Sequence, residues 1–150
     1  MNRLCVIPCG KRKIWDKGDY EGPALAKNAY TGIFHRLCQQ YANLFFTDWT
    51  ILSAKHGFLL PDDEVAENYD LSFSMKKEDI ISLARLKKQI LDKNLSGYDE
   101  IVILGGKKFK PIVEESFGKG PVYHYPLKEI QGIGYMQKRL KQAIEQRNEI

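Results

Sequence analysis

Near-continuous apolar runs alternate along the chain with segments of helical periodicity. Three runs, at residues 4–8, 49–53 and 100–106, contain consecutive rather than alternating apolar residues. This pattern is typical of strands that are buried on both faces of a parallel sheet. A weaker fourth strand is predicted at residues 121–126, where prolines bracket the sequence PVYHYP.

Apolar residues at three- and four-residue spacing predict helices in the intervening segments. The predicted helices cover residues 24–42, 77–93, 108–116 and 134–146. Strands that alternate with helices are typical of βαβ units with right-handed crossovers. We therefore expect a single α/β domain over residues 1–150. We expect it to be a three-layer α/β/α sandwich around a mainly parallel sheet of about four strands.

The composition agrees with an ordinary globular domain, since 43% of the 150 residues are hydrophobic and 28% are charged. No apolar run approaches the roughly 20 residues of a membrane span. The start of the chain, MNRLCVIPCGKRK, lacks the long apolar core of a signal peptide. Three cysteines, an odd number, argue against a disulfide framework. We expect a cytoplasmic protein without membrane association.

The net charge of +4 permits contact with phosphate groups but does not establish it. Lysines are distributed along the whole chain, so we favour a solvated basic surface over a nucleic-acid footprint. The second interpretation requires the lysines to converge in space.

The three strongest strands end in similar sequences, PCGKRK, SAKHG and LGGKKF. In open parallel sheets, ligands bind beyond the carboxyl ends of the strands. Small residues followed by cations therefore predict a binding site along one rim of the sheet. The predicted rim consists of Cys9, Gly10, Lys11, Lys13, Ser53, Lys55, His56, Gly105 and Gly106.

The first strand end supplies glycine for close backbone approach and two lysines that could hold a phosphate or carboxylate. It is not a P-loop, because the spaced glycines and the Lys-Ser/Thr pair are missing. Cys9 is either a nucleophile activated by a nearby cation or, as we favour, a small residue that packs at the strand end. Cys5 and Cys9 face the same side of the strand, but no second ligand pair completes a zinc site, so we expect no metal.

The second strand end contains His56, whose side-chain type suits proton transfer near neutral pH. The structural alternative is that Lys55 and His56 simply cap the sheet. We interpret His35 and His124 as structural. Ser53 could donate a hydrogen bond, but it lacks the G-x-S-x-G elbow of a hydrolase triad.

An acidic segment, LLPDDEVAENYD, follows the second strand end. Pro61 forces a turn, and if the segment folds back over the rim, Glu64, Tyr69 and Asp70 come within reach of a cleft. A carboxylate there could act as a general base or stabilise a cationic transition state. The alternative is a solvated acidic loop.

The segments PCGKRK, AYTGIF, ILSAKHGFLLPDDEVAENYD and GIGYMQKRL together resemble a bacterial and phage domain family of unknown function. Its pattern combines a Cys-Ser-x-x-Lys opening, a Tyr-Thr-Ser-x-x-Phe helix start, and Ser-Ala-Lys-His-Gly-Leu-Leu-x-Pro followed by Tyr-Asp. The resemblance covers almost the whole chain. Gly10 and Gly32 stand where the pattern has serine.

Two further families share parts of this pattern. The Gly-Leu-Leu-x-Pro…Tyr segment is similar to the YaaA peroxide-stress family, which is associated with DNA protection. The Pro-Cys-x-x-x-Lys opening is similar to the core domain of archaeosine synthase, which acts on a modified base in transfer RNA and resembles uracil-DNA glycosylases in fold. The resemblance implies a uracil-DNA glycosylase-like fold and a pocket lined by Cys9, Lys13, Ser53, Lys55, His56, Tyr69 and Asp70.

We therefore expect an enzyme that acts on a nucleobase or nucleoside, with chemistry at the N-glycosidic bond. Breaking this bond develops positive charge on the sugar and negative charge on the base. Asp70 or Glu64 would stabilise the first charge, and His56 or Lys55 the second.

An aromatic side chain, Tyr30 or Tyr69, would stack on the base. Two other classes of protein stay open at this point. One is a non-catalytic nucleic-acid-binding protein, and the other is a small-molecule binder that holds a nucleotide phosphate on the glycine-lysine rim. We expect no cofactor, and the sequence leaves the oligomeric state open.

Overall fold

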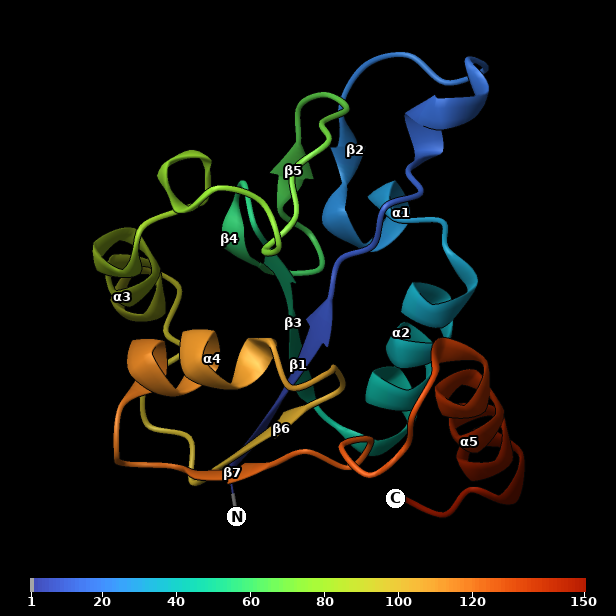
Figure 1. Ribbon diagram of the computed structural model, residues 1–150, viewed down its shortest axis with the longest axis vertical. Helices are drawn as coiled ribbons and strands as arrows, with labels where there is room; N and C mark the ends of the chain where they lie inside the picture. The colour runs from blue at the N-terminus through green and yellow to red at the C-terminus, as the bar shows by residue number, and fades with distance from the viewer. Residues whose placement is uncertain (1) are drawn as a thin grey trace.

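The computed structural model describes residues 2–150 and is built around a five-stranded sheet in the order β4-β3-β1-β6-β7. β1 pairs in parallel with β3 and β6, β6 pairs in parallel with β7, and β4 pairs with β3 in the antiparallel direction. The α/β class and the mainly parallel sheet are thereby confirmed. The strands are β1 (Arg3–Pro8), β3 (Asp48–Ser53), β4 (Gly57–Leu59), β6 (Glu100–Ile103) and β7 (Val122–His124) (Figure 1).

The four predicted strands are all present, and β4 is the fifth. The sequence did not indicate β4, because its three residues, GFL, are too short to display a period. A separate two-stranded ribbon pairs β2 (Ala24–Leu25) with β5 (Glu64–Val65) in the antiparallel direction. Residues that were predicted as helix and loop thus form a second small sheet.

Most predicted helices are present, and all but the last begin later than predicted. They are α1 (Ala26–Ala29), α2 (Ile33–Phe45), α3 (Leu83–Asp92), α4 (Phe109–Phe117) and α5 (Ile133–Gln146), with short 3-10 turns η1 (Ile14–Lys17) and η2 (Lys77–Asp79). Within residues 2–150, none of these helices is long and apolar enough to cross a membrane.

The continuous helix predicted for residues 24–42 is wrong. The backbone of Tyr30 is extended and bridges to Lys13, and Gly32 is extended as well, so α2 begins only at Ile33. The helix predicted to start at residue 77 begins at Leu83, after Ser82 accepts a hydrogen bond from the N–H of Arg85 at 3.2 Å. Long-range pairing in the first case and a capping serine in the second override the periodicity.

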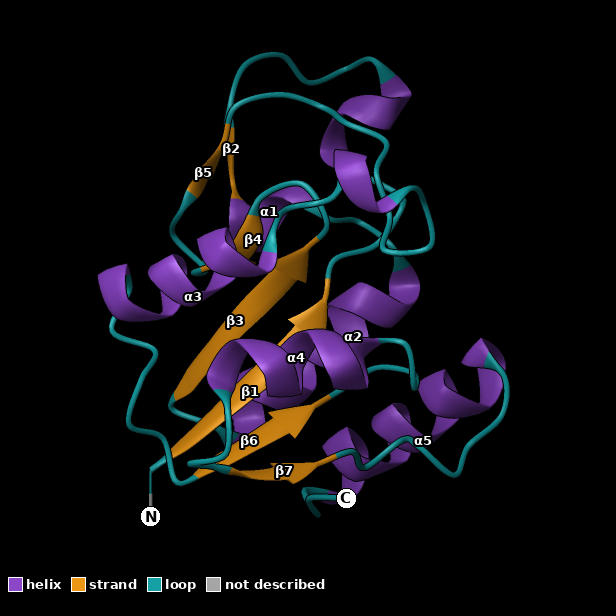
Figure 2. Cartoon of the chain, turned by 60° about the vertical axis from the view of Figure 1, so that its left-hand side comes forward, coloured by secondary structure: helices purple, strands orange, loops and turns teal. Residues whose placement is uncertain are grey.

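Side chains that alternate along the strands divide the core into two clusters. On β1, Cys5 and Ile7 belong to one cluster, and Leu4 and Val6 belong to the other. The first cluster includes buried residues of α2 and α5, and the second includes buried residues of α3 and α4 (Figure 2). Because helices pack on both faces, the central strands are apolar at consecutive positions.

The parallel strands β1, β3 and β6 end at the same edge of the sheet. The β2–β5 ribbon and α1 lie beyond this edge, next to the ends of β1 and β3 (Figure 1). The edge is therefore where segments distant in sequence come together.

Candidate functional site at the sheet edge

A cavity of about 760 Å³ lies at the carboxyl ends of β1 and β6. Its walls come from the segment after β1, the first turn of α2, the β6–α4 turn, the first turn of α5, and residues 70–75. We call it the sheet-edge cavity. Seven of the residues predicted from the sequence line it, namely Cys9, Gly10, Lys11, Lys13, Asp70, Gly105 and Gly106.

The sheet-edge cavity combines apolar walls with a strongly cationic set of polar side chains. Among the described residues that line it, Asp70 is the one carboxylate. The cations are Lys11, Arg12, Lys13 and Lys108, and the large apolar residues are Ile33, Phe34, Leu71, Phe73, Met75, Phe109, Ile133 and Met136. Such a lining suits a ligand that is both partly apolar and anionic.

Lys13 is the most deeply placed of these cations, since its side chain is only 4% exposed. Its Nζ donates a hydrogen bond to the carbonyl of Lys11 at 2.9 Å and lies 4.5 Å from the centre of the Tyr69 ring. Burial lowers the pKa of Lys13, while Cys9 and other neighbours act in the opposite direction. Within residues 2–150, Lys13 forms no direct ion pair. Its charge is stabilised by the Tyr69 ring, by the carbonyl of Lys11, and at longer range by Asp16 and Asp70.

Tyr69 stands at the centre of a hydrogen-bonded group beside the cavity. Its hydroxyl bonds to the hydroxyl of Tyr30 and, at 2.8 Å, to Ser53 Oγ. Burial raises the pKa of Tyr69 to about 12, and it raises that of Tyr30 as well. Both phenols are therefore neutral at physiological pH, where they position other groups rather than act as bases.

Ser53 ties the turn after β3 to Tyr69. Its Oγ accepts hydrogen bonds from the N–H of Lys55 at 3.2 Å and of His56 at 3.1 Å. The Ser-Ala-Lys-His-Gly sequence thus forms a tight turn whose serine is fully buried. Much of the motif is explained by this turn.

Lys55 and His56 do not line the sheet-edge cavity. Both line a separate hollow of about 490 Å³ near the start of α3. His56 meets Tyr69 edge-on, with ring centres 5.0 Å apart, and Lys55 Nζ lies 5.5 Å from the centre of the same ring. Burial and the nearby Lys55 lower the pKa of His56. Tyr69 thus contacts these two residues as well as Lys13.

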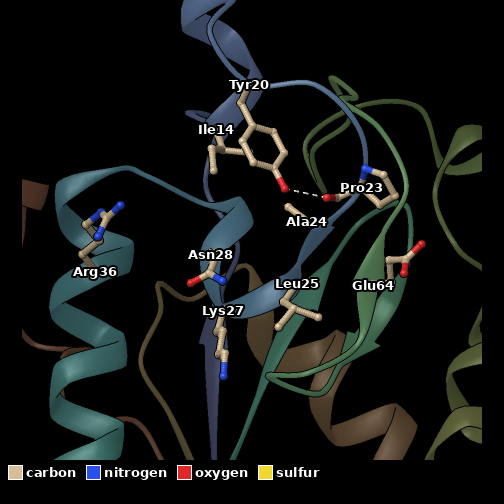
Figure 3. A pocket seen from close by; sticks show the side chains of 9 residues that line it. All are labelled: Ile14, Tyr20, Pro23, Ala24, Leu25, Lys27, Asn28, Arg36 and Glu64. Atoms are coloured by element: carbon tan, nitrogen blue, oxygen red, sulfur yellow. Dashed lines mark hydrogen bonds between the residues drawn. The ribbon is translucent and has the colours of Figure 1, made fainter.

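Glu64 lies apart from the other predicted residues. It belongs to β5 and lines a third hollow, of about 470 Å³, together with Tyr20, Lys27 and Arg36 (Figure 3). The pairing of β5 with β2 holds Glu64 there and prevents it from reaching the sheet edge.

His35 lines the sheet-edge cavity, although the sequence indicated a structural role. Its Nδ1–H donates to the carbonyl of Pro8 at 2.8 Å, and its Nε2 accepts from the amide of Gln39 at 2.7 Å. These two bonds fix a neutral tautomer, and burial lowers the pKa of His35. His35 is therefore a rigid part of the wall.

Other residues that line the cavity were not predicted from the sequence. Arg12 and Lys108 lie within the strand-end sequences PCGKRK and LGGKKF, so their signal was available. Phe73 and Met136 become lining residues only because segments 70–75 and α5 fold toward the sheet edge, which no local pattern indicates. Among the described residues, no three metal-ligating side chains gather into a group.

The fold and the sheet-edge cavity define an α/β protein with a cationic, partly aromatic ligand site. Residues 4–142 match the family of unknown function DUF6884, and the chain belongs to this family. Over all 150 residues it is 45% identical to the uncharacterized protein YfjM of Bacillus subtilis strain 168, and the match covers both chains completely.

Proposed function

We propose that this protein is an enzyme that acts on a nucleobase or nucleoside group in the sheet-edge cavity. The lining of the cavity supports the proposal best, because aromatic and apolar walls accommodate a planar base and cations flank a single carboxylate. The volume of about 760 Å³ is adequate for a nucleoside or nucleotide.

The proposal includes a uracil-DNA glycosylase-like three-layer sandwich, distantly related to the YaaA family and to the archaeosine synthase core domain. Two observations support it. Helices pack on both faces of the sheet, and the cavity lies at the carboxyl ends of parallel strands.

The proposed reaction is cleavage of an N-glycosidic bond by water. The C–N electron pair leaves with the base, which takes up a proton, while the water oxygen bonds to the sugar carbon and releases one. Asp70 would stabilise the cationic sugar, since it is the carboxylate that lines the cavity. The combined positive charge of the cations that line the cavity would stabilise the anionic base, a role that the sequence assigned to Lys55 or His56.

Lys55 and His56 act through Tyr69 in this proposal. Both contact the ring of Tyr69, and Lys13 lies over the same ring. They position Tyr69, and with it Lys13, without touching the substrate.

The test is release of a free base from a panel of modified DNA, RNA and nucleosides, measured by chromatography. Asp70→Asn should reduce the rate roughly 100-fold or more, because the developing cation loses its counter-charge. Asp62→Asn is the matched control, since Asp62 lies in the same acidic segment, is highly exposed and pairs with Lys27. The proposal fails if the native protein releases no base from any substrate, or if Asp70→Asn is as active as Asp62→Asn.

A non-catalytic nucleic-acid-binding protein is the second candidate, favoured by the exposed Lys11 and Arg12 at the cavity. It predicts binding that weakens steeply with salt. Under this alternative, Asp70→Asn leaves the affinity for nucleic acid, and any cellular effect that depends on it, unchanged.

A further inference from the structure

We infer that the sheet-edge cavity contains a phosphate subsite formed by Lys11, Arg12, Lys13 and Lys108. Its ligand is a phosphorylated nucleoside, free or within a strand, rather than a bare base or nucleoside. The base part of this assignment rests on the proposed function; the phosphate part rests on the charges around the cavity.

The first observation is an excess of cations without partners. The described residues that line the cavity include four cations and one carboxylate. None of these four cations forms an ion pair within residues 2–150, and one carboxylate against four cations leaves an excess of positive charge around the cavity. An anionic ligand would supply the missing counter-charge.

The second observation is the burial of Lys13. Lys13 is 4% exposed, so its ammonium has little access to water, and the one hydrogen bond that its Nζ donates within residues 2–150 goes to the carbonyl of Lys11. A buried ammonium with spare donors is costly unless an acceptor meets it. A phosphate oxygen in the cavity is a strong acceptor for those donors.

The third observation is the orientation of two long helices. α2 and α5 both begin at the cavity, where Ile33, Phe34 and Ile133 line it. Their N-cap residues, Gly32 and Gly132, have no side chain to accept bonds from the first-turn N–H groups. The partial positive charge of both helix starts therefore adds to that of the four cations.

The anionic and apolar parts of the ligand would be served by different walls. Phe73 and Phe109 meet edge-on with ring centres 5.9 Å apart, and both line the cavity. A nucleotide joins a planar apolar group to a compact anion, which matches this division. An inorganic anion alone would leave the aromatic wall unused.

The test compares AMP, GMP, CMP and UMP with the corresponding nucleosides and with a short single-stranded oligonucleotide, by calorimetric titration of the full chain. At least one nucleotide should bind about tenfold or more tightly than its nucleoside, because charge-assisted hydrogen bonds form to the phosphate. Lys108→Gln should weaken nucleotide binding severalfold. Lys107→Gln is the matched control, since this neighbouring exposed lysine does not line the cavity.

Lys11→Gln provides a second variant on an exposed side chain, so the test does not depend on the folding of Lys13→Gln. Tighter, more salt-dependent binding of the oligonucleotide would identify a strand as the source of the phosphate, and equal binding would identify a free nucleotide. The inference is overturned if nucleosides bind as tightly as nucleotides, or if Lys107→Gln and Lys108→Gln weaken binding equally.

The two proposals fail in different ways. Nucleotide binding that depends on Lys108, without release of any base, would sustain the phosphate subsite and refute the enzyme. Base release that requires Asp70 but does not depend on a phosphate group or on Lys108 would sustain the enzyme and refute the phosphate subsite.

Discussion

At the scale of single residues, His35 makes stability depend on pH. It is 2% exposed, and its Nε2 already accepts a hydrogen bond from Gln39, so the charged form is disfavoured in the folded protein. The folded pKa lies below the ordinary 6.5, so the unfolded chain binds the proton first as pH falls. The stability contributed by the neutral ring is present above about pH 6.5 and is lost below it.

We expect the free energy of unfolding to fall between pH 7.5 and 5.5, by at most about 1.4 kcal/mol per pH unit for each such histidine. His56, whose pKa is also lowered, adds to the slope. Urea unfolding at a series of pH values measures it. His35→Gln should flatten the slope, and so should Gln39→Ala, which removes the bond that opposes protonation. An unchanged slope in both variants would contradict this account.

At the scale of the element, hydrophobic periodicity predicted the long strands and helices but not the short ones. β1, β3 and β6 were predictable, because helices on both faces make their sequences continuously apolar. β4 and the β2–β5 ribbon were not predictable, since each strand has only two or three residues and is stabilised by pairing with its partner strand. The early end of α1 has the same origin, because Tyr30 leaves the helix to bridge with Lys13.

The turn between β3 and β4 depends on Gly57 for two separate reasons. Its φ of +74° disfavours any other residue, and an added Cβ would lie 2.2 Å from Gln89 Oε1 and 2.6 Å from Ile81 Cδ1. Gln89 cannot give way freely, because it accepts from the N–H of Phe58 and donates to the carbonyl of His56. We expect Gly57→Ala to destabilise the fold by about 3 kcal/mol or more.

Gly18→Ala is the control that separates strain from collision. Gly18 has nearly the same φ, +75°, but nothing lies within 4 Å of an added Cβ. It should cost only about 1 kcal/mol, the penalty of the left-handed backbone. Urea unfolding measures the free energy of unfolding of both variants, and the comparison holds if that free energy depends on urea concentration with the same slope in each. Similar costs would show that the contacts of Gln89 do not matter.

At the scale of the whole molecule, the rule that ligands bind at the carboxyl ends of parallel strands correctly placed six of the nine predicted rim residues at the cavity. Parallel strands end at one edge, and so Cys9, Lys13 and Gly105 line the same cavity. The rule could not show that β4 begins directly after His56 and leads the chain away from the cavity, or that Tyr69 then returns to contact both His56 and Lys13. These placements depend on how residues 60–75 close over the sheet, which is set by long-range contacts.

The three cysteines differ in whether they lie at the sheet-edge cavity or in the buried core. Cys9 is half-buried and lines the cavity, whereas Cys5 and Cys38 are fully buried, and burial raises the pKa of both. We expect a thiol reagent such as DTNB to label one thiol of the native protein quickly, and Cys9→Ser should abolish that phase. The other two should react only through opening of the core, at rates that rise with denaturant. Rapid labelling of all three thiols would mean that helices α2 and α5 leave the sheet without global unfolding.

A nucleotide that occupies the cavity should slow the labelling of Cys9 directly, and it should slow the labelling of the two buried thiols by raising the stability of the whole fold.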